Sequence, residues 1–217
     1  MTQINSGVSK KYLMTEGNLF IVSAPSGAGK SSLVHHALKT IDNLCYSISY
    51  TTRQPRGLEQ NGKDYYFVSQ DVFKFMRENG EFLECAEVHG NYYGTHQATT
   101  DKIIKSGKDV ILDIDVQGAA QIKEKMPKAI SIFILPPSPE ILESRLRARA
   151  ENTEADIERR LKNARDEIKH CKDYQFVIVN DEFGNACRAL EAIIRAERQV
   201  LSRQLDKTEL IIKSFGG

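Results

Sequence analysis

The sequence predicts an α/β fold in which a parallel β-sheet is flanked by helices. Four apolar runs rich in β-branched residues recur along the chain, and such near-continuous hydrophobicity is typical of strands buried on both faces. Segments with helical character lie between or after these runs, and this alternation favours a parallel sheet with crossover helices. A chain of 217 residues suits one domain with small inserted lobes. The strands are expected at 19–23, 109–114, 130–135 and 176–179.

The helices can be justified from their end signals. Ser138 is a good N-cap because Pro139 follows it at the first helical position. Thr153 and Asp156 have the spacing of a capping box. A turn near 150–152 would join two helices into a hairpin, so we expect an arginine-rich insertion over 139–165. The helices are expected at about 31–39, 97–106, 117–125, 139–150, 154–170 and 185–203.

Residues 45–95 break the alternation of strands and helices. They carry many aromatic residues, several glycines and short alternating stretches, which predict a small inserted lobe built mainly of short strands, of mixed β/α character. Residues 1–16 are expected to be a flexible leader, and 199–217 a C-terminal tail that continues as helix. The core of the domain over 17–198 then consists of 17–44, 96–138 and 166–198.

A glycine-rich segment connects the first expected strand to the first expected helix. It matches the Walker A pattern, except that Ala24 replaces the first glycine, which is acceptable where that residue keeps a negative φ. Backbone N–H groups of such a loop cradle phosphates, Lys30 would neutralise phosphate charge, and the Ser31 hydroxyl would bind Mg²⁺. An ordinary turn is the alternative. The segment predicts a P-loop NTPase sheet and a triphosphate site at Ala24, Pro25, Ser26, Gly27, Ala28, Gly29, Lys30, Ser31 and Ser32.

Composition excludes several other classes of protein. Lys plus Arg number 30 against 29 Asp plus Glu, so no global charge attracts nucleic acid or an anionic membrane. The four cysteines form no Cys-x-x-Cys pair, which favours free thiols in a reducing compartment. No run is long enough to span a bilayer, and the N-terminus lacks the apolar stretch of a signal peptide. We therefore expect a cytoplasmic protein without nucleic-acid or membrane partners.

The lobe over 45–95 contains a second set of phosphate-binding candidates. Arg53 and Arg56 flank a proline, and guanidinium groups bind phosphate oxygens in a bidentate manner. Tyr65 and Tyr93 would add hydroxyl donors, although their rings could simply pack in the lobe. Glu84 ends an apolar run, where an exposed carboxylate is the plain alternative.

Several motifs in this region closely resemble guanylate kinase. The first is Ser-x-Thr-Thr-Arg-x-Pro-Arg over 49–56, and Glu-x-x-Gly-x-x-Tyr-x-Phe follows over 59–67. Gly-Asn-Tyr-Tyr-Gly over 90–94 comes after Glu84, and Ile-Leu-Asp-Ile-Asp-x-Gln-Gly and Val-Ile-Val-Asn-Asp complete the series. The matches run from about residue 17 to 198 in the order of the family, whose members carry alanine or glycine at the position of Ala24.

The resemblance implies reversible transfer of a phosphoryl group from ATP to GMP, with Mg²⁺. It assigns the GMP phosphate to Arg53, Arg56, Tyr65 and Tyr93, with Arg53 also catalytic. The residues that meet or surround the guanine are Ser49, Glu84, Thr95 and Asp115.

The chemistry of guanine fits these residue types. Guanine presents two adjacent donors, N1–H and the 2-amino group, and a carboxylate at Glu84 would accept both. Hydroxyls of Ser49 and Thr95 would donate to O6. Adenine would place its unprotonated N1 against the same carboxylate, and a site built on such bonds can reject the wrong base by about 10⁴ or more.

The arginine-rich insertion resembles the mobile lid of the family. Arg145, Arg149 and Arg160 match lid residues that close over the phosphates, whereas Arg147 and Arg159 have no such match and are interpreted as solvated. Substitution of Arg149 by alanine is expected to lower kcat far more than it weakens the binding of GMP. Asn180 matches an adenine-side residue, and a strand-ending cap is its alternative.

Asp113 and Asp115 lie at the end of one expected strand, two residues apart, so they should point the same way at its C-terminal edge, where α/β ligands bind. Asp113 either orients water on Mg²⁺ or caps the neighbouring loop. No histidine has metal-ligand spacing, and phosphoryl transfer does not need one.

The sequence therefore predicts a GMP kinase with ATP and GMP as its small-molecule partners, and allows a homo-oligomer. One alternative is a protein-binding guanylate kinase-like module without catalysis, but such modules have degraded phosphate loops. Another is a P-loop kinase for a different small phosphate substrate. A GTPase is disfavoured because no Asn-Lys-x-Asp motif occurs.

Overall fold

The fold is built on a five-stranded parallel sheet with the order β2-β7-β1-β8-β9. The computed structural model describes residues 16–88, 90–148 and 153–216. All four expected strands are present. A fifth, β2, joins the edge beside β7 and falls across the expected boundary between core and lobe at 44 and 45. The strands are β1 (Leu19–Ser23), β2 (Leu44–Tyr46), β7 (Asp109–Asp113), β8 (Ile130–Leu135) and β9 (Phe176–Val179).

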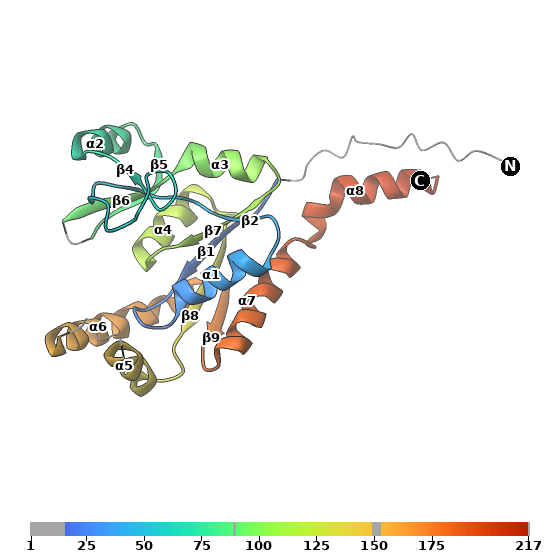
Figure 1. Ribbon diagram of the computed structural model, residues 1–217. Coiled ribbons are helices and arrows are strands. Elements are labelled where there is room, and N and C mark those ends of the chain that lie inside the picture. The colour runs from blue at the N-terminus through green and yellow to red at the C-terminus, as the bar shows by residue number, and fades with distance from the viewer. Residues whose placement is uncertain (1–15, 89, 149–152, 217) are drawn as a thin grey trace.

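Helices cover both faces of this sheet and create two apolar layers (Figure 1). On one face the core contains Phe20, Leu33 and Leu190, all fully buried. On the other it contains Ile21 and Ile122. Residues 20 and 21 alternate between the two layers, as neighbours in a strand must. The first layer is formed by α1 (Lys30–Thr40) and α7 (Phe183–Glu197), and the second by α3 (Gln97–Lys105) and α4 (Val116–Lys125).

The expected lobe is a second, mixed sheet with the order β4-β3-β6-β5. Its small core contains Phe73, Met76 and Phe82. A helix that the sequence analysis did not expect supplies two of these residues, and the Ser69 hydroxyl caps its first turn. The elements are β3 (Tyr50–Thr51), β4 (Tyr66–Phe67), α2 (Gln70–Glu78), β5 (Phe82–Val88) and β6 (Asn91–His96).

The arginine-rich insertion is a helical hairpin of α5 (Pro139–Arg147) and α6 (Glu154–Glu167). Ser138 caps α5 and Thr153 forms a capping box with Asp156, as the sequence predicts. Leu146 and Ala164 are buried where the two helices pack together. The expected helix over 154–170 ends earlier, because a 3₁₀ segment, η1 (Ile168–Asp173), continues from α6.

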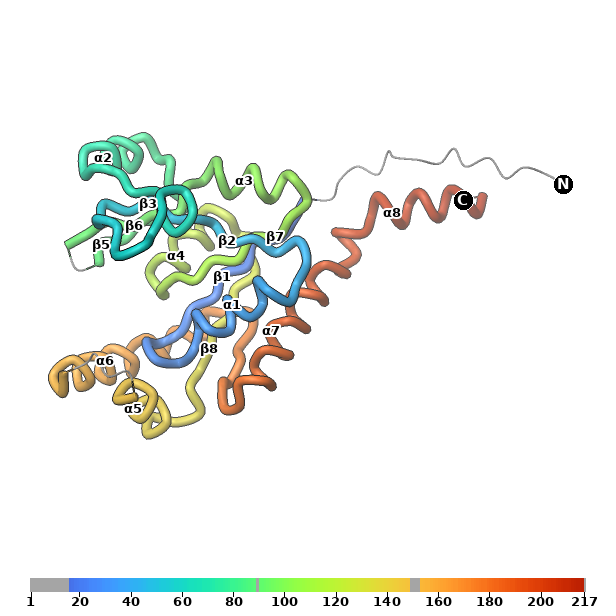
Figure 2. The backbone as a smooth tube through the Cα atoms, in the orientation of Figure 1, coloured from blue at the N-terminus to red at the C-terminus, as the bar shows by residue number. Residues whose placement is uncertain are grey.

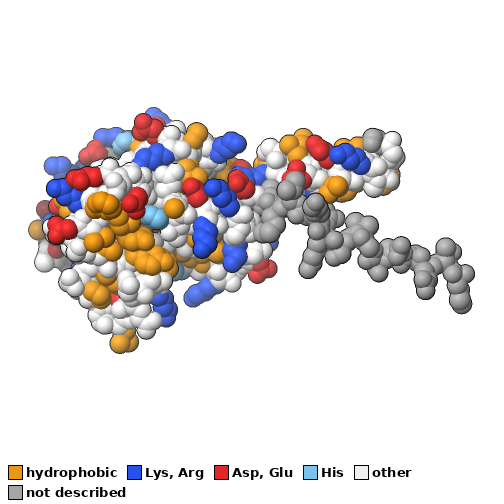
Figure 3. Space-filling model, turned by 90° about the horizontal axis from the view of Figure 1, so that it is seen from above, with side chains coloured by type: hydrophobic (Ala, Val, Ile, Leu, Met, Phe, Trp, Pro, Cys, Tyr) orange, Lys and Arg blue, Asp and Glu red, His pale blue; other side chains and the backbone are white. Residues whose placement is uncertain are grey.

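The expectation of one helix over 185–203 is wrong, because the chain turns at residues 198–200 and continues as α8 (Leu201–Ser214). Helix α8 projects from the body at the end opposite to α5 and α6 (Figure 2), and no residue of it is buried. Apolar side chains are exposed along it, while Lys and Arg are interspersed with Asp and Glu over the body (Figure 3). In the described residues no helix is long and apolar enough to cross a membrane.

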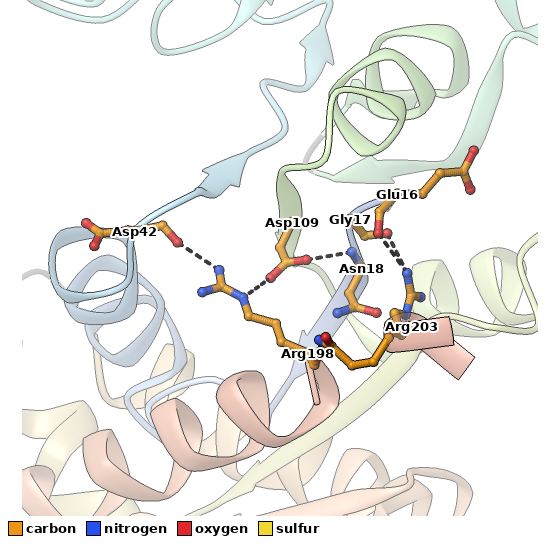
Figure 4. Close-up of polar contacts among 8 residues, drawn as sticks. Glu16, Gly17, Asn18, Asp42, Asp109, Arg198 and Arg203 are labelled. Atoms are coloured by element: carbon orange, nitrogen blue, oxygen red, sulfur yellow. Dashed lines mark hydrogen bonds and ion pairs between the residues drawn. The ribbon is translucent and has the colours of Figure 1, made fainter. Parts of the chain in front are cut away.

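Polar contacts tie the base of α8 to the start of the central sheet (Figure 4). Arg203 Nη1 donates to the backbone carbonyls of Glu16 and Gly17, at 3.0 and 3.1 Å. Arg198 pairs with Asp109, Nε to Oδ2, at 2.7 Å. These contacts fix where the tail leaves the domain. Most of the expected leader, 1–15, lies outside the described residues.

Candidate active site

The glycine-rich segment forms a loop between β1 and α1 at the C-terminal edge of the central sheet. Gly27 and Gly29 have φ values of 95° and 94°, in the region that favours glycine. A Cβ on Gly27 would also lie 2.9 Å from Leu142 of α5. Ala24 is not among the described residues with positive φ, so alanine fits the first position of the pattern. The loop therefore has the backbone that a phosphate cradle requires.

Lys30 and Ser31 both contact Asp113 at the end of β7. Lys30 Nζ lies 2.7 Å from Asp113 Oδ1 and donates to the carbonyl of Ile114 at 2.8 Å. The Ser31 hydroxyl donates to Asp113 Oδ2 at 2.7 Å. The adjacency of β1 and β7 creates this cluster, because parallel strands place their carboxyl ends at one edge. The sequence analysis allowed Asp113 either to orient water on Mg²⁺ or to cap the neighbouring loop. In this structure its carboxylate contacts Lys30 and Ser31, at the end of that loop.

A hollow of about 310 Å³ lies over the loop. Lys30, Asp113 and Asp115 contribute to its wall, and so does Glu167 at the end of α6. Burial raises the pKa of Glu167 above its ordinary value. The sequence analysis did not single out Glu167, because nothing in its local pattern distinguishes it from the exposed carboxylates of the same helix.

Asn180 joins the phosphate loop to the helical hairpin. Its Nδ2 donates to the carbonyl of Ala28 at 2.7 Å, and its own carbonyl accepts from Arg145 Nη2 at 2.9 Å. Arg145 Nη1 and Asn180 Oδ1 are buried without a partner among the described residues. Asn180 thus supports the loop and holds Arg145, and each side chain keeps one unpartnered polar atom among the described residues.

Arg147 and Arg159, which the sequence analysis interpreted as solvated, lie in ion pairs on the surface of the hairpin. Arg147 forms ion pairs with Glu143 and Glu154, and Arg159 pairs with Asp156, all on the surface. Arg160 is partly exposed on α6. The prediction for Arg149 lies outside the described residues.

In the second sheet, Arg53 and Arg56 are organised by Glu59. Arg53 Nη2 donates to Glu59 Oε1 at 2.9 Å, and the backbone N–H of Arg56 donates to Oε2 at 2.7 Å. Arg53 also lies 5.4 Å from the centre of the Tyr65 ring, which contacts Tyr93 edge-on. Arg53, Tyr65 and Tyr93 therefore form one group of side chains, and Glu59 ties the backbone of Arg56 to it, while the Arg56 side chain is exposed.

Glu84 and Thr95 face each other across β5 and β6 and are buried in the second sheet. The Thr95 hydroxyl donates to Glu84 Oε1 at 2.6 Å. Burial raises the pKa of Glu84, and the bond from Thr95 partly opposes that rise. The plain alternative of an exposed carboxylate is excluded, and Thr95 donates to Glu84 in this structure.

Asp115 and Ser49 complete the predicted base site. Asp115 is the N-cap of α4, because its Oδ1 accepts from the backbone N–H of Gly118 at 2.8 Å. A Cβ on Gly118 would lie 3.1 Å from Glu84 Oε2, so the helix approaches the carboxylate closely. Ser49 is partly exposed immediately before β3. No group of three or more His, Cys, Asp or Glu in the described part of the chain forms a metal site of its own.

Comparisons with known proteins agree on one family. The family model described as guanylate kinase matches residues 16–197. The guanylate kinase of Salmonella choleraesuis (strain SC-B67) is 51% identical over 204 residues, covering 93% of this chain and 99% of that protein. The guanylate kinase of Nitrosospira multiformis is 49% identical over 191 residues, covering 88% of this chain and 91% of that protein.

A solved structure gives the same answer for the fold. The crystal structure of guanylate kinase from Anaplasma phagocytophilum matches with a TM-score of 0.70 and 37% identity. The match covers 94% of this chain and 97% of that one. With a phosphate loop on one sheet and a buried carboxylate on the other, the chain belongs to the guanylate kinase family.

Proposed function

We propose a role for each part of the site in the reaction of this family, the phosphorylation of GMP to GDP with ATP as donor. The two substrates occupy opposite sides of the site. ATP lies over the phosphate loop and GMP lies against the second sheet. An oxygen of the GMP phosphate attacks the γ-phosphorus of ATP in line, and ADP leaves. The protein contributes positioning and electrostatic stabilisation, which is where such enzymes gain most of their rate.

On the ATP side, the loop residues 24–32 hold the phosphates through backbone N–H groups, and Lys30 offsets their charge. Ser31 and Asp113 present hydroxyl and carboxylate oxygens 2.7 Å apart, a donor set that suits a hard cation such as Mg²⁺. When bound, Mg²⁺ supplies charge neutralisation on the phosphate oxygens. Ser31 would ligate it, and Asp113 would orient its water.

Asn180 is the residue that would meet the adenine of ATP, because its unpartnered Oδ1 suits the adenine amino group as an acceptor. Arg145, which donates to the Asn180 carbonyl, keeps its Nη1 unpartnered among the described residues. Arg145 and Arg160, together with Arg149, are the lid cations that stabilise charge on the transferred group. Closure of the hairpin before transfer would exclude water as a competing acceptor.

On the GMP side, Arg53, Arg56, Tyr65 and Tyr93 hold the phosphate, and Arg53 helps to orient it for attack. Glu84 accepts the guanine N1–H and 2-amino protons. Ser49 is the donor to O6, while Thr95 fixes Glu84, since its hydroxyl proton is directed to that carboxylate. Asp115 lies next to this carboxylate through Gly118.

The observation that carries this proposal is the burial of Glu84, which is 6% exposed and has Thr95 as its hydrogen-bond donor. A buried carboxylate needs further donors, and guanine supplies two. The experiment is a coupled ADP-release assay with ATP, Mg²⁺ and each nucleoside monophosphate in turn. Turnover specific for GMP, abolished by Lys30→Ala and strongly reduced by Glu84→Ala, is expected.

Two other results would contradict the proposal. Equal turnover with AMP and GMP would show that Glu84 does not read the base. Binding of GMP without turnover, in protein that also binds ATP, would indicate a binding module. The alternative of a protein-binding module without catalysis has no support in the two relatives described above. Both are guanylate kinases, and the match to this chain covers nearly the whole length of each.

A further inference from the structure

The strand that carries Glu84 is the edge strand of the second sheet. Among the residues that the structure describes, the order β4-β3-β6-β5 leaves the outer edge of β5 without a partner strand. The ladder between β5 and β6 is also irregular between Phe82 and Glu84, where the register shifts. An edge strand with an irregular register does not by itself hold a side chain at the position, accurate to a fraction of an ångström, that recognition of a base needs.

Helix α4 of the central domain takes the place of a neighbouring strand at this edge. The backbone N–H of Cys85 donates to Gln121 Oε1 at 3.1 Å, and Gln121 Nε2 donates to the carbonyl of Cys85 at 3.2 Å. The side-chain amide therefore satisfies both backbone groups of the residue next to Glu84, as the peptide of a paired strand would.

Two more residues on the same face of α4 contact β5 around Glu84. Lys125 Nζ donates to the carbonyl of Phe82 at 2.6 Å, two residues before Glu84. Gly118 lies against Glu84 Oε2, because a Cβ at this position would come within 3.1 Å of that oxygen and crowd it. Gly118, Gln121 and Lys125 are three and four residues apart, a spacing that places them on one side of a helix.

We propose that Gln121 is a positioning residue for guanine specificity, which sets the place of the Glu84 carboxylate by holding the Cys85 backbone against α4. This inference rests on the proposed reading of guanine by Glu84. The 2-amino group distinguishes GMP from inosine monophosphate (IMP), which retains N1–H and O6. A Glu84 carboxylate that is displaced or mobile forms a weaker hydrogen bond with the guanine 2-amino group. Loosening β5 therefore lowers the preference for GMP over IMP.

The test is the ratio of kcat/KM for GMP to that for IMP in the full-length Gln121→Met enzyme. Methionine has a similar length and fills the same space without either hydrogen bond. The ratio is expected to fall about tenfold, through a higher KM for GMP with kcat changed less than about threefold. Gln121→Asn is a second variant, because its amide is one methylene too short to reach the Cys85 backbone. Its ratio of kcat/KM for GMP to that for IMP is expected to fall by a similar factor.

Gln175→Leu is the matched control. Gln175 Oε1 accepts from the backbone N–H of Ser131 at 2.9 Å, so this change also removes a side-chain to backbone bond between two elements, far from the base site. A purely structural role for Gln121 predicts that both variants lower the unfolding midpoint and leave the GMP-to-IMP ratio unchanged. That result would overturn the proposal.

A second comparison separates this inference from the proposed function. Glu84→Gln should remove most of the preference for GMP over IMP if Glu84 reads the base. If the ratio of kcat/KM for GMP to that for IMP falls in Glu84→Gln but stays at the wild-type value in both Gln121 variants, only the role of Gln121 is rejected. An unchanged ratio in Glu84→Gln would reject the reading of guanine by Glu84, and with it the inference built on that reading.

Discussion

The hydroxyl of Thr95 donates a 2.6 Å hydrogen bond to Glu84 Oε1, between two side chains buried in the same sheet. The two residues are direct partners in the ladder of β5 and β6. A carboxylate in this position loses most of its contact with water, and Thr95 returns one donor to it. The pair prepares an acceptor that only a ligand with adjacent donors can fully satisfy.

Thr95→Val should weaken this acceptor while keeping the shape of the side chain. Glu84 Oε1 is then left without its donor, which costs about 1–3 kcal/mol when the acceptor stays buried. We expect a lower free energy of unfolding and a KM for GMP raised about tenfold, because the carboxylate is held less well. Urea unfolding and steady-state kinetics measure both effects.

Thr100→Val is the control for that change. Thr100 is also buried, and its hydroxyl contacts Ser47 and the carbonyl of His96. Loss of stability is expected here too, with an unchanged KM for GMP. A KM that rises equally in both variants would show that the Thr95 effect is general loosening of the sheet.

The raised pKa of Glu84 predicts an acid limb in the pH profile. Only the ionised carboxylate accepts two donors, so kcat/KM for GMP should fall as the pH drops through a pKa above the ordinary 4.5. The sign for stability is opposite. Because the folded state favours the protonated form, the contribution of Glu84 to the free energy of unfolding falls as pH rises from 4.5 through the raised pKa.

The measurement compares pH profiles of the wild type and Glu84→Gln. The phosphate of GMP titrates near pH 6 in both, as phosphate monoesters do, so its effect cancels in the ratio of the two profiles. An acid limb that persists unchanged in Glu84→Gln would assign it to another group.

Gly118→Ala should separate helix stability from base recognition. Alanine normally stabilises a helix by about 1 kcal/mol relative to glycine. Here the new methyl would lie 3.1 Å from Glu84 Oε2, so the carboxylate must shift. We expect a several-fold loss in kcat/KM for GMP, measured by initial rates.

Gly184→Ala is its counterpart in α7, where the nearest atom to a new Cβ is the end of the Arg188 side chain at 3.6 Å. This variant should gain stability and keep full activity. Unaltered kinetics in Gly118→Ala would mean that the carboxylate moves without consequence for GMP.

Arg145→Ala should lower kcat by about 10²-fold, the range typical for loss of one preorganised donor at developing charge. The Arg145 guanidinium bonds to Asn180, which in turn supports the phosphate loop. Arg147→Ala on the same helix removes only surface ion pairs and should change kcat little. Equal rates in the two variants would remove Arg145 from the catalytic group.

Local patterns were sufficient for most of the central fold. The β-branched runs predicted four strands of the central sheet, and Ser138 and Thr153 predicted two helix starts, because these signals act within a few residues. Where short-range signals were ambiguous, the expectations were incomplete. Three residues at 44–46 become a strand only because β7 offers an edge, and the sequence analysis did not locate α2 within a lobe that it expected to be of mixed β/α character.

By itself the sequence determined the phosphate loop, the family and the residue types that suit guanine, because each depends on spacing along the chain. Tertiary structure alone decided how the side chains share their bonds. Thr95 donates to Glu84, Asn180 holds the loop through Ala28, and Gln121 holds the backbone of Cys85. These pairs are 11, 152 and 36 residues apart, and no local pattern specifies which distant groups satisfy each other when both are withdrawn from water.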